Sequence, residues 1–74
     1  MEKLTARELQ LLAFVANGNS SKQTAHALGI TEQTVKNAMS LIMRKLKANT
    51  RTHAVAMALT AGVVRLTDQI PALD

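Results

Sequence analysis

Residues 21–40, SKQTAHALGITEQTVKNAMS, decide the fold of this chain. They predict two helices joined at Gly29, because glycine adopts the positive φ angle that ends one helix and redirects the chain. Ala25 precedes this glycine by one helical turn, where a crossing helix needs a small side chain. Ile30 and Val35 are placed to fill the wedge between the two helices. The segment therefore predicts a helix-turn-helix, although an αα-hairpin of a generic helical bundle would show similar turn chemistry.

Capping residues and apolar periodicity extend this prediction to four helices. Their expected spans are about residues 5–17, 20–28, 31–46 and 50–62. Thr5 and Glu8 predict a capping box at the first of them. Strict alternation of apolar and polar residues is missing, so we expect an all-α fold. One domain should cover residues 1–66, with residues 67–74 as a flexible tail.

The composition favours a polyanionic partner and argues against a single-stranded nucleic acid or a membrane as that partner. The formal net charge is +4, and no Asp or Glu occurs between Gln33 and Leu66. A field of one sign over half a small domain attracts nucleic acid. Phe14 is the only aromatic residue, which favours duplex DNA over a single strand held by base stacking. The longest apolar runs, Leu11–Ala16 and Ala54–Leu59, have six residues each and are too short to span a membrane, so we expect no membrane contact and a cytoplasmic location.

Chemistry for catalysis or metal binding is missing from the sequence. His26 and His53 lie far apart, the chain has no cysteine, and no paired carboxylates accompany either histidine. Metal sites and activated nucleophiles need such groups close together. We therefore expect no cofactor, no metal and no enzymatic activity.

Several short motifs resemble the LuxR-type (GerE-like) helix-turn-helix domain in order and spacing. They are LTARE at 4–8, ANG at 16–18, TEQTVK at 31–36, MRKL at 43–46 and RTHAV at 51–55. The resemblance covers about residues 4–66. It implies a four-helix fold that binds duplex DNA, usually as a dimer, and regulates transcription. Region 4 of bacterial sigma factors is also similar, but the RTHAV motif fits the LuxR type better. The sequence departs from the family at Ala38, Lys47 and His53, where histidine, glycine and an acid are usual.

The third predicted helix separates into an apolar and a polar side. At about 100° per residue, Val35, Ala38, Ile42 and Leu46 share one side, flanked by Met39 and Met43. The opposite arc holds the predicted base-reading residues Lys36, Asn37, Ser40 and Arg44. The resemblance implies the same role for the first three of these. Lysine can donate to guanine or bond a phosphate, and asparagine can pair with adenine. Ordinary solvated polar residues are the alternative for Asn37 and Ser40.

Phosphate contacts are expected around this helix, because they set the register on the duplex. The candidates are Ser21, Lys22, Thr34, Lys45, Lys47 and Arg51. Each of them taken alone could equally be a solvated surface residue.

Two further surfaces are expected to contact protein. The resemblance implies a homodimer through the fourth helix, where the candidates are Ala54, Met57, Ala58 and Ala61. The alternative is packing of this helix on the first one, a role for which we expect Val55 and Leu59. In the first helix, Ala6, Leu9 and Ala13 share a face that could dock RNA polymerase or a co-regulator. Isolated exposed apolar residues are the alternative there.

These observations predict a sequence-specific, duplex-DNA-binding transcriptional regulator with residues 31–46 in the major groove. The rival interpretation is a protein-interaction module that pairs with a larger regulator or with RNA polymerase and modulates it. Only the DNA-binding interpretation requires the polar arc of the third helix to be exposed, because a base can be contacted only by accessible side chains.

Overall fold

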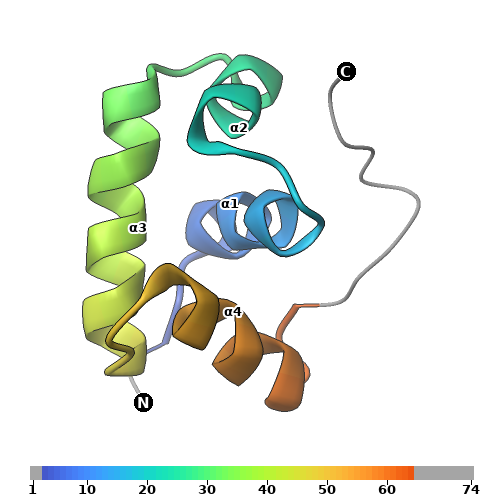
Figure 1. Cartoon of the computed structure of the whole chain (residues 1–74), viewed down its shortest axis with the longest axis vertical. Helices are drawn as coiled ribbons and strands as arrows, with labels where there is room; N and C mark the ends of the chain where they lie inside the picture. Colours follow the sequence, from blue (N-terminus) through green and yellow to red (C-terminus); the bar gives the residue numbers. More distant parts are fainter. Residues whose placement is uncertain (1–2, 65–74) are drawn as a thin grey trace.

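The computed structural model describes residues 3–64, and within that range every regular element is a helix. The helices are α1 (Ala6–Ala16), α2 (Ser21–Leu28), α3 (Glu32–Leu46) and α4 (Arg51–Thr60). Figure 1 shows α3 standing along one side of the molecule, with α2, α1 and α4 arranged beside it. The all-α prediction is confirmed, and each helix begins and ends close to its predicted limits. The expected tail, residues 67–74, lies outside the described residues.

Hydrogen bonds from side chains fix where the helices begin. The Thr5 hydroxyl accepts from the backbone N–H of Glu8 at 3.1 Å, and the Thr5 N–H donates to the Glu8 carboxylate at 2.7 Å. Ser20 and Gln23 form the same reciprocal box at α2, so Ser20 rather than Ser21 is the cap. These boxes satisfy N–H groups that have no partner within the helix. The predicted capping box of α1 is therefore confirmed.

The turn between α2 and α3 has the geometry that its glycine predicts. Gly29 adopts φ 69°, and the N–H of Ile30 donates to the Ala25 carbonyl at 3.0 Å. Ala25 is only 4% exposed, as the close crossing of the two helices requires. This turn changes the direction of the chain, so that α3 packs against the other helices along one side and exposes the opposite side.

All four helices contribute to one apolar core. Its fully buried side chains include Leu11 and Leu12 of α1 with Val35 and Ile42 of α3. On α3 the core side is centred slightly differently from the prediction, since Met39 is buried whereas Ala38 is only half-buried. Ala38 still packs against the edge of this core.

Helix α4 faces the core with smaller residues than predicted. Ala54 and Ala58 are fully buried, whereas Val55 and Leu59 are half-buried. Because α4 contacts both α1 and α3, small side chains at its centre allow the backbones to approach closely. Val55 and Leu59 pack against this core as expected, while Ala54 and Ala58, which were expected at a dimer surface, lie at its centre. Of the helices within residues 3–64, none is long and apolar enough to cross a membrane.

Lys47 ends α3 in a conformation that favours glycine. Its φ is 57°, and it is the one non-glycine residue with positive φ among residues 3–64. A side chain costs about 1 kcal/mol or more in this left-handed region. We therefore expect Lys47→Gly to raise the free energy of unfolding by about 1 kcal/mol in chemical denaturation. Lys47→Ala is the control, because it removes the charge and keeps the Cβ; equal stability of the two variants would contradict the prediction.

Candidate nucleic-acid interface

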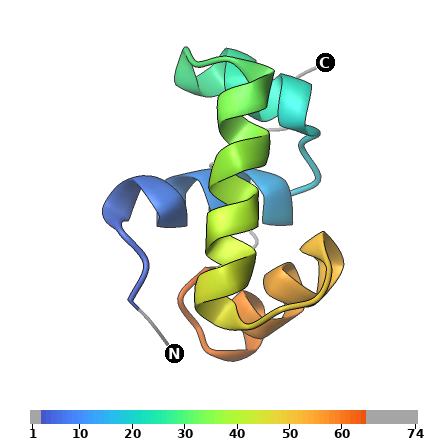
Figure 2. The ribbon, with the colours of Figure 1, turned by 90° about the vertical axis from the view of Figure 1, so that its left-hand side faces the viewer.

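The polar arc of α3 faces solvent. Lys36, Asn37, Ser40 and Arg44 are all exposed, while Val35 and the other core residues of α3 point to the opposite side. Figure 2 shows α3 crossing in front of the other helices, so that no helix of the described part covers its outer side. The four predicted base-reading residues thus lie on one accessible surface, which we call the α3 face.

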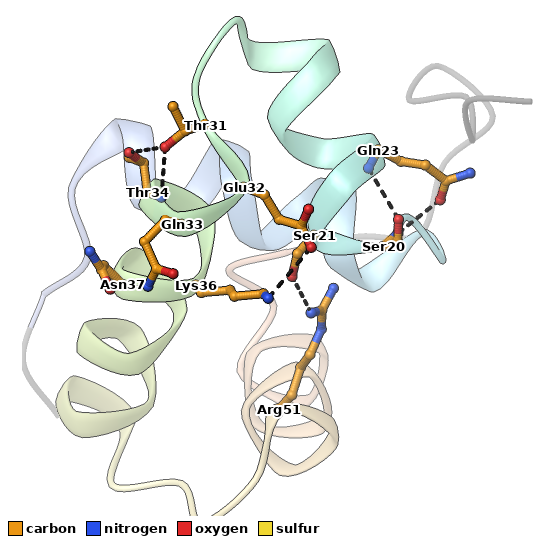
Figure 3. A network of polar contacts seen from close by, with 10 residues as sticks. All are labelled: Ser20, Ser21, Gln23, Thr31, Glu32, Gln33, Thr34, Lys36, Asn37 and Arg51. Atoms are coloured by element: carbon orange, nitrogen blue, oxygen red, sulfur yellow. Dashed lines mark hydrogen bonds and ion pairs between the residues drawn. The ribbon is translucent and has the colours of Figure 1, made fainter.

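Two polar pairs lie along the α3 face, and Figure 3 shows both. The Gln33 amide Nε2 donates to the Asn37 Oδ1 at 2.9 Å. The Lys36 ammonium lies 3.5 Å from the Glu32 carboxylate, and the two side chains are 57% and 48% exposed. Exposed pairs of this kind stabilise a helix by less than about 1 kcal/mol, so Lys36 can exchange its partner at little cost. Gln33 was not among the predicted base-reading residues, although its place one turn before Asn37 on the same helix indicates that the two side chains can interact.

A second set of contacts ties the start of α4 to the start of α2. The Arg51 guanidinium donates to the Ser21 hydroxyl at 2.8 Å and to the Asn19 carbonyl at 3.1 Å. Ser21 is buried, and Arg51 reaches it across the space between the two helices, as Figure 3 shows. Ser21 and Arg51 were both predicted to contact phosphate, but their side chains are hydrogen-bonded within the protein instead. Lys22, one residue after Ser21, remains exposed beside the α2 N-terminus.

Lys45 forms a partly buried ion pair with Glu8. Its ammonium lies 2.7 Å from the Glu8 carboxylate, with the two side chains only 17% and 9% exposed. The same Glu8 oxygen accepts from the N–H of Thr5, so one carboxylate caps α1 and holds α3. The Lys45 hydrogen bond, with the Thr5 backbone N–H, holds the pKa of Glu8 below its ordinary value. This inward pairing corrects the expectation that Lys45 is free to contact a phosphate.

The lowered pKa of Glu8 predicts a loss of stability in acid. A carboxylate whose pKa is lower in the folded than in the unfolded protein contributes fully above its ordinary pKa of 4.5. That contribution is lost as the pH falls through the lowered value. We expect the wild type to have a higher free energy of unfolding than Glu8→Gln at pH 7. This difference should shrink as the pH falls below 4.5. Urea denaturation across this range measures it, and a difference independent of pH would refute the assignment.

The structure divides the predicted dimer residues of α4. Ala54 and Ala58 are fully buried within the chain, so they cannot contact a partner, and that part of the prediction was wrong. Their small size serves the close packing of α4 on the core. Met57 is half-buried and Ala61 is exposed. Together with Ala56 and Thr60, these two residues line a shallow, largely apolar depression on the outer side of α4, which we call the α4 depression.

The docking patch expected on α1 is largely covered. Leu9 and Ala13 are half-buried and pack against the apolar core, and only Ala6 of the three residues is exposed. Packing within the chain therefore accounts for the apolar character of this face. The apolar face of α1 was the feature that favoured an interaction module, and only Ala6 of that face is exposed.

The two histidines do not form part of a metal site within residues 3–64, where no group of three potential ligands gathers. His53 has a local role instead. Its Nδ1 accepts from the backbone N–H of Asn49 at 3.2 Å, just before α4 begins. The acid that is usual at this position in the LuxR type could accept the same kind of hydrogen bond, so the departure preserves the start of α4.

Comparison with known proteins identifies the family and the fold of this chain. The profile of the family described as bacterial regulatory proteins, luxR family, matches residues 2–58. This chain belongs to the LuxR family. It is a LuxR-type helix-turn-helix DNA-binding domain of transcription regulation, and the resemblance found in its motifs is confirmed.

Relatives of this LuxR-type domain include longer regulators. The chain is 41% identical over 64 residues to the transcriptional regulatory protein YdfI of Bacillus subtilis, covering 86% of this chain and 30% of YdfI. It is 45% identical over 62 residues to the transcriptional activator RamA of Corynebacterium glutamicum, covering 84% of this chain and 22% of RamA. The chain thus spans less than a third of the length of either relative.

Solved structures of the family share the fold. The transcription factor GerE superposes with a TM-score of 0.83 at 30% identity, over 90% of this chain and all of GerE. A structure of the Vibrio cholerae VqmA dimer without its target DNA gives a TM-score of 0.79 at 27% identity, over 93% of this chain and 31% of VqmA. The four-helix arrangement of this LuxR-type domain is therefore that of its family.

Proposed function

We propose that this domain recognises a specific sequence in duplex DNA by placing α3 in the major groove, and that it regulates transcription as a dimer in the cytoplasm. The observation that supports this most directly is the uncovered α3 face. It carries an ammonium, an amide, a hydroxyl and a guanidinium on Lys36, Asn37, Ser40 and Arg44. The major groove admits an α-helix and presents a distinct pattern of donors and acceptors for each base pair.

Each residue of the α3 face suits a particular partner. Lys36 and Arg44 can donate to the O6 and N7 of guanine, and Asn37 can pair with the N6 and N7 of adenine. Ser40 can donate or accept, so it adapts to either strand. The Glu32 partner of Lys36 is exposed, and the ammonium is therefore available to exchange it for a base.

Phosphate contacts in this proposal come from exposed groups that flank the α3 face. Lys22 lies at the start of α2, Thr34 in the first turn of α3, and Lys47 at its end. The positive end of the α2 helix dipole also favours an anion there. Ser21, Lys45 and Arg51 act indirectly in this proposal, because their inward hydrogen bonds hold the helices in place.

The α4 depression is the surface proposed for the dimer. Met57 and Ala61 line it with Ala56 and Thr60, and the small residues among them would allow two helices to approach closely. VqmA, whose structure contains the same fold, is described as a dimer. Two copies related by a two-fold axis would bind half-sites about 10 bp apart, one turn of the duplex.

Selection of bound sites from a random duplex pool, at two salt concentrations, tests the proposal. We expect a recurrent motif at both, because base contacts persist when phosphate contacts weaken. Salt-sensitive binding without a motif would show only a basic surface and would contradict sequence-specific recognition. Absence of binding at both concentrations would leave the interaction module as the better function.

Replacing Lys36 distinguishes a base contact from a phosphate contact. We expect Lys36→Ala to cost about 1–3 kcal/mol on the selected motif and little on unrelated duplexes. Lys47→Ala should weaken binding to all duplexes alike and reduce the slope of log K against log salt by about 1. Electrophoretic mobility shifts on both kinds of duplex measure this. An unchanged sequence preference in Lys36→Ala would rule out its base-reading role.

A further inference from the structure

We propose that Gln33 is a positioning residue for DNA specificity, which orients the amide of Asn37 for adenine. The inference rests on the proposed function, since it concerns how the α3 face reads a base. It assigns a role to a residue that, like Asn37, is exposed on α3. The observation behind it is the hydrogen bond between the two side-chain amides.

The geometry of this bond fixes the orientation of Asn37. Gln33 lies four residues before Asn37, and its Nε2 donates to the Asn37 Oδ1 at 2.9 Å. Figure 3 shows the two side chains next to each other on the outer side of α3. A free asparagine amide can turn by half a rotation and exchange the places of its oxygen and nitrogen. While Gln33 is the donor, as it is in this structure, the Asn37 oxygen faces Gln33, and such pairs are favourable at this spacing.

The selected orientation leaves the groups that adenine needs. Adenine presents N7 as acceptor and N6 as donor, and an asparagine pairs with it through its Nδ2 and its Oδ1 respectively. Gln33 uses one of the two lone pairs of Oδ1, so the second remains for the N6 hydrogen. Neither Nδ2 hydrogen takes part in the Gln33 bond. Asn37 is thereby ordered before DNA arrives, which reduces the entropy lost on binding.

Two substitutions at residue 33 separate this role from its alternatives. Gln33→Met keeps the length of the side chain and removes the donor, whereas Gln33→Lys keeps an N–H donor. Asn37→Ala first identifies the base pair that Asn37 reads within the selected motif. We then expect Gln33→Met to lower the preference for adenine at that base pair roughly fivefold, a typical coupling for neighbouring polar residues. Gln33→Lys should retain the preference, even though its charge raises overall affinity.

A double-mutant cycle provides the decisive measurement. In the Asn37→Ala background, Gln33→Met should have no further effect on base preference, because the residue acts through Asn37. The thermal unfolding midpoint should stay unchanged in both Gln33 variants, which separates positioning from a structural role. An effect of Gln33→Met at a different base pair, or one that persists without Asn37, would overturn the inference.

Failure of this inference differs visibly from failure of the proposed function. If wild type selects a motif and Gln33→Met reads it with the same preference, only the role of Gln33 is refuted. If wild type selects no motif, sequence-specific binding itself is refuted, and the role of Gln33 with it.

Discussion

Lys45→Met is expected to lower the free energy of unfolding by about 3 kcal/mol, because it leaves the buried Glu8 carboxylate without its cation. The Glu8 side chain is only 9% exposed and keeps just the hydrogen bond from Thr5 in this variant. In a domain of this size, such a loss lowers the unfolding midpoint by more than about 10 °C. Urea denaturation and thermal unfolding followed by circular dichroism measure it.

Lys36→Met is the matched control on the same helix. Its ammonium is also paired with a carboxylate, but both side chains are about half exposed. We expect a change of no more than about 0.5 kcal/mol for this variant. Equal effects of the two substitutions would contradict the structural role of Lys45. A drop of about 1 in the salt slope of DNA binding for Lys45→Met, with stability preserved, would restore its role as a phosphate contact.

Ala56→Glu is expected to reduce affinity for a duplex with two half-sites by about 100-fold, without weakening binding to a single half-site. Ala56 is exposed within the α4 depression, so the substitution should not disturb the core. In a dimer it would bring two like charges together on an apolar surface, where they repel and lose their water. Sedimentation velocity and mobility shifts on both duplexes measure the oligomer and the affinity ratio.

Gln10→Glu provides the control for added charge. Gln10 is exposed on α1 and accepts from Arg7 at 3.1 Å, a contact that glutamate can keep. Its ratio of two-site to single-site affinity should equal that of wild type. An unchanged ratio in Ala56→Glu as well would show that the α4 depression is not the dimer surface.

Local chemistry made the helices predictable from sequence. The start of every described helix is marked by one capping side chain that accepts from a backbone N–H in the first turn. These caps are Thr5, Ser20, Thr31 and Thr50. Glycines with positive φ follow the ends of α1, α2 and α4. The solvent-facing side of α3 was equally predictable, because a regular helix turns by a constant angle per residue.

Tertiary contacts made the remaining roles unpredictable. Glu8 and Lys45 lie 37 residues apart, and Ser21 and Arg51 lie 30 residues apart, so no local pattern indicates that they are partners. A lysine at the end of a basic helix is as suited to phosphate as to a buried carboxylate. The burial of Ala54 and Ala58 was missed because small residues on a helix suit either a dimer surface or a close crossing within the chain, and only the tertiary structure distinguishes the two.

The bridge from Arg51 to Ser21 and Asn19 has a mechanical consequence. It joins the beginning of α4, the helix proposed for dimerisation, to the beginning of α2, which is proposed to lie beside the duplex. The ion pair between Lys45 and Glu8 likewise holds α3 to α1. In the proposed dimer, each copy would therefore keep a fixed distance between its α4 depression and its α3 face. Binding to operators with different half-site spacings would then require one copy to rotate relative to the other.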